Sequence, residues 1–92
     1  MDIRNLVLLQ LATIVGEFTP YSMPPDVDDT TLLVNFHLDS VAFTSLLARL
    51  EEQIGFIPLG ILRGTSFPET VGELVAAYEN GAEEMVEIFQ GV

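Results

Sequence analysis

Three residues within four positions, His37, Asp39 and Ser40, carry the side-chain types of a hydrolase triad. A triad needs a base and a nucleophile that converge from a supporting scaffold, together with a pocket and donors for the oxyanion. Residues so close in sequence do not easily supply that geometry, and the chain has no second histidine to act as a base. The sequence therefore argues against hydrolysis, and we expect a protein that is not an enzyme.

Ser40 stands at the predicted start of an amphipathic helix, in the run Leu38-Asp39-Ser40-Val41. The first turn of a helix has unpaired amides and about half a positive charge, so an anion attached there is stabilised. A serine at this place can carry a phosphodiester whose charge lies against those amides. The alternative is that Ser40 or Asp39 only caps the helix, which is a common use of both residue types.

The acidic run that begins at Asp26 invites a metal interpretation. Asp26 and Asp28 start like a calcium-binding loop, but the sixth position is Thr31 instead of glycine and the twelfth is His37 instead of glutamate. The chain has no cysteine and one histidine, which excludes thiolate and multi-histidine sites. We therefore predict no metal site.

Composition limits the function further. The 92 residues leave room for one domain, and 14 acidic against three basic residues give a net charge of −11. Such a surface repels phosphate backbones and anionic lipids, so we expect neither nucleic acid as a partner nor insertion into a membrane. The absence of cysteine fits a cytoplasmic protein, and we expect a monomer.

Four segments are predicted to be helical and none to be a strand, which gives an all-α fold of three main helices and one short helix. The first helix covers residues 3–15, with Asp2 as its N-cap and Gly16 after its end. A connection over residues 17–38 follows, and its three prolines, Pro20, Pro24 and Pro25, cannot lie inside regular structure. Its second half is expected to pack through apolar residues: Leu32, Leu33, Val34 and Phe36.

The second helix is predicted to begin at Asp39-Ser40 and to end at Gly55. Its apolar residues recur at helical spacing and are expected to form one core stripe: Phe43, Leu46, Leu47, Leu50 and Ile54. A short helical turn is expected over residues 60–63.

The last helix is predicted to begin with a capping box, in which Thr70 caps an amide and Glu73 reaches back to another. Asn80-Gly81 is typical of a helix end, so we expect a core domain over residues 3–80 and an acidic tail over residues 81–92. One or two further turns of this tail are expected to dock through apolar residues: Met85, Val86, Ile88 and Phe89. Residues 1–92 thus form a single predicted domain.

From Asp28 to Tyr78 the chain resembles the acyl carrier protein family. The likeness lies in an Asp followed by an apolar pair, the Asp39-Ser40 motif, a helix that closes with Leu50-Glu51-Glu52, and a last helix that reads Thr-Val-Gly-Glu-Leu-Val. The resemblance implies an acyl-carrier-like bundle and a 4′-phosphopantetheine arm on Ser40 that holds acyl groups as thioesters. It also implies partners: a phosphopantetheinyl transferase, whose magnesium Asp39 would help to position, and acyl-transferring or condensing enzymes of fatty-acid, lipid or polyketide type.

The chain departs from this family around the serine. His37 stands where the family usually has glycine at a turn, so we expect His37 to adopt a backbone angle that favours glycine. The second helix has no acidic residue between Asp39 and Glu51, so we expect partners to recognise it largely by apolar contact. The predicted partner surface comprises Leu38, Val41, Ala42, Ser45, Ala48, Ile61 and Leu62.

The resemblance further implies that an acyl chain slides between the helices, with candidate lining residues Phe43, Leu46, Leu47 and Ile61. Phe43 is open to three interpretations, because its ring can fill the core, line this path or block the entrance. Two other functions also stay open. One is a peptidyl or aminoacyl carrier, although such carriers more often have paired glycines with His or Asp beside the serine. The other is a helical interaction adaptor without a prosthetic group, which would dock through segment 40–68, whose net charge is zero.

Overall fold

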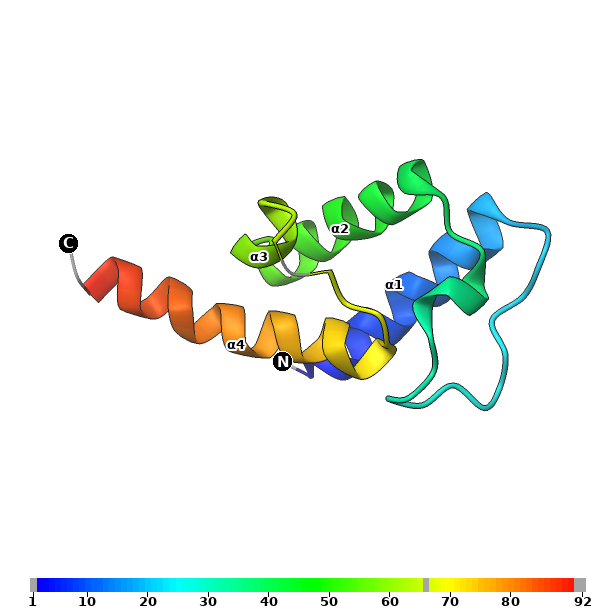
Figure 1. The fold of residues 1–92 in the computed structure, drawn as a ribbon, viewed down its shortest axis with the longest axis horizontal. Helices are drawn as coiled ribbons and strands as arrows, with labels where there is room; N and C mark the ends of the chain where they lie inside the picture. The colour runs from blue at the N-terminus through cyan, green and yellow to red at the C-terminus, as the bar shows by residue number, and fades with distance from the viewer. Residues whose placement is uncertain (1, 66, 91–92) are drawn as a thin grey trace.

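The computed structural model describes the backbone of residues 2–65 and 67–90, and the side chains as far as residue 81. Within these residues the fold is all-α, as predicted, with three long helices, one short helix and one 3-10 helix (Figure 1). In chain order they are α1 (Ile3–Phe18), η1 (Leu33–Phe36), α2 (Ser40–Ile54), α3 (Leu59–Leu62) and α4 (Val71–Gln90). Across the described ranges no helix combines the length and the apolar character needed to cross a membrane.

Helix α1 begins where the sequence predicts and ends later. The carboxylate of Asp2 accepts a hydrogen bond from the backbone N–H of Asn5 at 3.2 Å, which confirms the predicted N-cap. Gly16, expected just beyond the helix, lies inside it. The helix ends instead at Thr19, whose extended backbone is favoured by the following Pro20. The predicted end was wrong because glycine permits a helix to stop without forcing it to.

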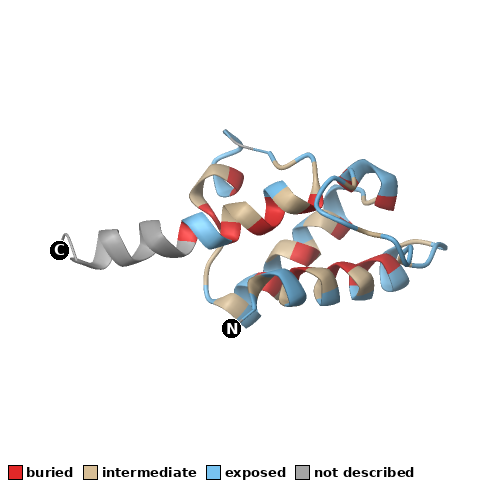
Figure 2. Cartoon of the chain, turned by 90° about the horizontal axis from the view of Figure 1, so that it is seen from below, coloured by how far each residue is buried: buried red, intermediate tan, exposed pale blue. Residues whose placement is uncertain are grey.

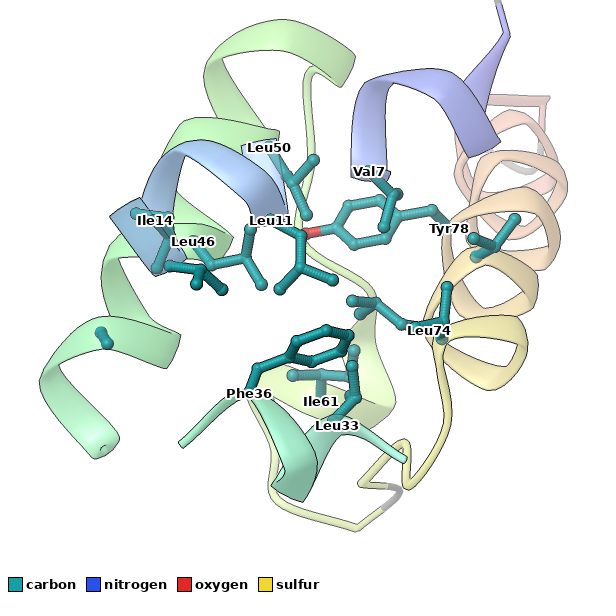
Figure 3. Close-up of a cluster of buried hydrophobic side chains, with 14 residues drawn as sticks. Val7, Leu11, Ile14, Leu33, Phe36, Leu46, Leu50, Ile61, Leu74 and Tyr78 are labelled. Carbon is teal, nitrogen blue, oxygen red and sulfur yellow. The ribbon is translucent and has the colours of Figure 1, made fainter. Parts of the chain in front are cut away.

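Side chains from every helix meet in one apolar core (Figure 3). Figure 2 shows where the buried residues lie along the helices. Helices α1, α2 and α4 turn their buried residues toward one another, and η1 and α3 close the remaining side. Burial of one large apolar side chain stabilises a fold by about 1.5–3 kcal/mol, so these contacts hold the bundle together. The buried residues are Val7, Leu11, Ile14, Val15, Leu33, Phe36, Ala42, Leu46, Leu50, Ile61, Val71, Leu74, Val75 and Tyr78.

The hydroxyl oxygen of Tyr78 is the one buried polar side-chain atom among the described residues that has no hydrogen-bond partner. Its ring reaches from α4 between Val7 and Leu50, and its hydroxyl points toward Leu11 (Figure 3). Burial raises the pKa of this hydroxyl, and the nearby negative charge of Glu51 raises it further. The hydroxyl therefore stays neutral, and the ring serves the core through its size.

The connection between α1 and α2 is fastened to the start of α4 by backbone hydrogen bonds. The N–H of Leu33 donates to the carbonyl of Glu69 at 2.8 Å, and the N–H of Val71 donates to the carbonyl of Thr31 at 3.0 Å. The expected packing of its second half is half right, because Leu33 and Phe36 are buried whereas Leu32 and Val34 are exposed. The 3-10 helix η1 has three residues per turn, so Leu33 and Phe36 share the face toward the core and Val34 between them points away from it.

The predicted capping box opens α4, since the N–H of Glu73 donates to the Thr70 hydroxyl at 3.1 Å and the Glu73 carboxylate accepts from the N–H of Thr70 at 3.3 Å. The predicted end at Asn80-Gly81 was wrong, because α4 continues to Gln90. Gly81 allows a close approach instead: a Cβ there would lie 2.7 Å from the ring of Phe56. The expected docking of Met85, Val86, Ile88 and Phe89 lies outside the described side chains.

Gly72 allows a second close approach, at the point where the connection meets α4. A Cβ on Gly72 would lie 2.9 Å from the Cβ of Asp29 and 3.0 Å from its carbonyl oxygen. The N–H of Gly72 donates to that same carbonyl at 3.0 Å, so the two backbones are held together at this point. A side chain here would push the connection away from the bundle.

We expect Gly72→Ala to lower the free energy of unfolding by about 1–3 kcal/mol, because the added methyl group overlaps the backbone of Asp29. Gly16→Ala is the matched control, since no atom lies within 4 Å of its added Cβ. That control is expected to raise stability by about 0.5–1 kcal/mol, the usual gain of alanine over glycine inside a helix. Urea unfolding followed by circular dichroism measures both, and a shift of the same sign in the two variants would contradict this account.

Candidate functional site

The start of α2 is shaped by Asp39. This residue is the N-cap, and its Oδ1 accepts a hydrogen bond from the backbone N–H of Ala42 at 2.8 Å. Its own carbonyl accepts the first intrahelical bond, from the N–H of Phe43 at 2.9 Å. Of the two residues that could cap this helix, Asp39 takes the role and leaves Ser40 free of it.

Ser40 is the first residue of α2, and it is exposed. Its hydroxyl makes no hydrogen bond to the described part of the chain. The N–H groups of Ser40 and Val41 also lack intrahelical partners, because the first amides of an α-helix precede any carbonyl that could accept from them. The site therefore combines a free hydroxyl with two free amides at the positive end of a helix.

His37 adopts the left-handed backbone conformation that the sequence predicts, with φ 58° and ψ 35°. Its N–H donates to the carbonyl of Val34 at 3.2 Å and so ends η1. Its ring packs on the ring of Tyr21, with the two centroids 4.7 Å apart. This turn sets the path of the chain into Asp39 and Ser40.

A groove of about 710 Å³ lies beside Ser40. Its walls come from η1, α2 and α3, and from the segments that join η1 to α2, α2 to α3 and α3 to α4. Large apolar residues make up most of these walls: Phe43, Leu47, Ile57, Ile61, Leu62 and Phe67. The charged residues that line it are Asp39 at the start of α2 and Glu51 three turns later. The groove is therefore apolar along its length and carries negative charge at both ends.

Three of the four predicted acyl-pocket residues line this groove: Phe43, Leu47 and Ile61. Leu46 does not line the groove, because its side chain is fully buried in the core. Phe43 is half-buried, and its ring lies 5.8 Å from that of Phe67, centroid to centroid. Phe43 thus forms part of the groove wall together with a residue from the α3–α4 segment.

The predicted partner surface is only partly exposed. Val41, Ala48 and Leu62 are exposed, and Leu38 and Ser45 are half-buried. Ala42 and Ile61 are buried, at 1% and 6% exposure, so their assignment to the surface was wrong. Ala42 shares the buried face of α2 with Leu46 and Leu50, and Ile61 is the buried residue of α3. Of the predicted core stripe, Leu46 and Leu50 are buried, whereas the other three residues are partly buried against the core: Phe43, Leu47 and Ile54. Apolar residues of core and surface look alike in sequence, so spacing alone did not show that Ala42 faces inward.

Arg49, which lies in the otherwise uncharged stretch of α2, is engaged within the bundle. Its guanidinium forms an ion pair with the carboxylate of Glu17 near the end of α1. A second ion pair in the described part of the chain joins Arg4 of α1 to Asp29 of the connection. Both pairs are partly exposed, so each adds at most about 1 kcal/mol. Their main effect here is that Arg49 is not free to meet a partner.

Sequence reasoning missed the residues that loops contribute to the groove. Phe67 is 64% exposed and Val34 is 74% exposed, and both line it. Neither belongs to a longer periodic pattern, because Val34 lies in the four-residue helix η1 and Phe67 lies in the irregular segment between α3 and α4. The one signal in the sequence is a large apolar residue, Phe67, directly before Pro68 in a polar loop.

The acidic run around Asp28 forms a turn. The carboxylate of Asp28 accepts hydrogen bonds from the hydroxyl of Thr30 at 2.6 Å and from its N–H at 2.9 Å. These bonds lower the pKa of Asp28, the hydroxyl bond most of all. No three His, Cys, Asp or Glu residues in the described ranges lie close enough together to hold a metal ion.

Comparisons of this chain with protein-family models, with curated proteins and with solved structures found no match. The resemblance to a family that the sequence suggested therefore stays a prediction.

We expect Asp39→Ala to lower the free energy of unfolding by about 0.5–2 kcal/mol, because the N–H of Ala42 loses its acceptor. Asp39→Ser, which keeps an N-cap oxygen, is the control and is expected to retain most of the stability. Thermal unfolding of the three proteins measures the difference. Equal stability of Asp39→Ala and the unmodified sequence would show that the cap does not hold the start of α2.

Proposed function

We propose that this protein is an acyl carrier, loaded with a 4′-phosphopantetheine arm on Ser40. The observation that carries the proposal is the free, exposed hydroxyl of Ser40 at the start of α2, beside an apolar groove. Either feature alone is common in proteins. Their combination is what a carrier needs, because the attachment point must be open to enzymes while the cargo has apolar surface to rest on.

The residues at the start of α2 fit a phosphodiester. The N–H groups of Ser40 and Val41 can donate to its oxygens, and the helix dipole favours its negative charge. Asp39 keeps its own carboxylate on the N–H of Ala42, so it does not compete for those two amides. When bound, the arm supplies the terminal thiol on which acyl groups are held as thioesters.

Loading requires an enzyme, because no base hydrogen-bonds the Ser40 hydroxyl within the described part of the chain. In that reaction a bond forms between the Ser40 oxygen and the phosphorus of coenzyme A that bears the pantetheine. The phosphoanhydride bond breaks, the adenosine bisphosphate leaves, and the serine proton passes to a base of the transferase. Asp39, one residue away and exposed, is placed to help position the magnesium ion of that transferase as well as to cap α2.

The groove indicates the class of cargo. Its apolar walls would gain about 0.8 kcal/mol for each methylene group that they remove from water. Asp39 and Glu51 at its two ends disfavour anionic cargo through like-charge repulsion. We therefore infer neutral, largely apolar acyl groups, as used by fatty-acid, lipid or polyketide-type enzymes. A peptidyl cargo is the less favoured carrier function, because polar peptide groups gain little from such walls.

The surface around Ser40 suits partners that dock by apolar contact. Val41 and Leu62 are each 64% exposed, and the one arginine of α2 is paired with Glu17. The same exposed apolar residues would serve an adaptor without a prosthetic group, which is the second candidate function. As part of the carrier proposal we expect, from the sequence, that the protein is a monomer and works in the cytoplasm.

We expect the purified protein to gain the mass of one phosphopantetheinyl group when it is incubated with coenzyme A, magnesium and a promiscuous phosphopantetheinyl transferase. Ser40→Ala is expected to gain nothing. Ser45→Ala, in the same helix and half-buried, is the matched control and is expected to be loaded like the unmodified sequence. Intact-protein mass spectrometry measures all three. If the unmodified sequence gains no adduct, the carrier proposal is contradicted and the adaptor function is favoured. Turnover of simple esters would indicate a hydrolase.

We expect a saturated medium-length acyl chain on the loaded arm to raise the melting temperature above that of the arm with a free thiol. The groove binds the chain in the folded state alone, which stabilises that state. Phe67→Ser is expected to reduce this increase because it removes part of one wall. Leu9→Ser is the control, since Leu9 is 60% exposed on α1 and does not line the groove. An equal increase in both variants would show that the chain rests elsewhere.

A further inference from the structure

His37 has a backbone conformation that its side chain does not favour. It is the one non-glycine residue with a positive φ in the described ranges. In the left-handed region the Cβ of an L residue lies too close to the following carbonyl oxygen, a strain that glycine avoids. The turn before Ser40 therefore contains a strained residue where glycine would fit without strain. A contact made by the ring of His37 can offset that strain.

That ring lies against Tyr21 from the long connection. The two ring centroids are 4.7 Å apart and the planes are inclined by 34°, a separation at which aromatic rings attract one another. Tyr21 is 56% exposed, so this contact is not part of the core. Neither ring lines the groove. The stack joins two surface segments that are 16 residues apart in sequence and leaves the cargo path untouched.

Both partners of the stack are anchored. The N–H of Tyr21 donates to the hydroxyl oxygen of Thr19 at 3.1 Å, and that hydroxyl donates to the carbonyl of Val15 at 2.8 Å. Tyr21 is thereby fixed to the end of α1, while the N–H of His37 is fixed to the end of η1 through Val34. The end of α1 and the start of α2 lie at the same end of the bundle (Figure 1).

We infer that Tyr21 and His37 form a positioning pair that fixes the direction in which Ser40 is presented to the transferase that loads it. The pair holds the turn at residue 37 against α1, and the turn in turn sets the backbone of Asp39 and Ser40. This inference rests on the proposed function, because it describes how the same hydroxyl is positioned for loading. Neither residue contacts the reacting atoms, so both act through the path of the chain.

The first test compares loading rates with stability. His37→Gly removes the ring and relieves the backbone strain, and Tyr21→Ser removes the ring from an exposed position. Both are expected to lower the kcat/KM of the transferase about tenfold, mainly through kcat, because the hydroxyl is less well oriented. The melting temperature of His37→Gly is expected to equal or exceed that of the unmodified sequence. That of Tyr21→Ser is expected to lie within about 2 °C of it. Tyr21→Phe keeps the stack and is expected to keep the rate, as is the distant control Leu9→Ser.

The second test does not depend on loading. Amide hydrogen exchange of Ala42 and Phe43, whose N–H groups donate to Asp39 at the start of α2, is measured by NMR on the unloaded protein. It is expected to be faster in His37→Gly and Tyr21→Ser and unchanged in Tyr21→Phe. If the unmodified sequence takes up no group from coenzyme A, the proposed function fails and the exchange rates alone decide on the pair. The inference would be overturned if both ring-deleting variants had the same amide exchange rates as the unmodified sequence. It would also be overturned if they were loaded at the same rate.

Discussion

The hydrogen bond from the N–H of Ala42 to the carboxylate of Asp39 is the interaction on which the site depends. It gives the N–H of the third helical residue an acceptor that the helix itself does not provide, and it fixes where α2 begins. Because Asp39 takes the capping role, Ser40 becomes the first helical residue, exposed and with its hydroxyl free. If Ser40 were the cap instead, its hydroxyl would accept from an N–H of the first turn and would no longer be free as an attachment point.

Helix α2 serves the fold and the site with two adjacent faces. One face packs Ala42, Leu46 and Leu50 into the core shared with α1 and α4 (Figure 3). The next face carries Phe43 and Leu47, which line the groove. The core face is closed to solvent, so an apolar chain can meet the second face without disturbing the first. This division explains how a small bundle can keep a groove open without exposing its core.

The sequence predicted the helix starts better than the helix ends, for a physical reason. Gly55 ends α2 as predicted, with φ 111°, but two other predicted ends were wrong. Asp2, Asp39 and Thr70 act on amides three residues away, so their effect is local and readable from the chain. Gly16 and Gly81 were expected to stop helices, but whether a glycine stops a helix depends on what packs against it. The groove shows the same limit: its α2 and α3 residues follow from helical spacing, whereas Phe67 comes from an irregular segment whose position tertiary contacts decide. The left-handed turn at His37 was predictable, and its stack on Tyr21 was not, because the two residues meet only in the folded chain.

The central claim is that Ser40 is an attachment point in the living cell and not merely a free hydroxyl at a helix start. Intact-mass measurement of the protein purified from its native cells tests this most directly, followed by fragmentation to locate any added group. The account predicts a population that carries a phosphopantetheine arm on Ser40, part of it with an acyl group on the thiol. A protein found only at the mass of its unmodified sequence, under conditions in which the cell makes it in quantity, would contradict the claim.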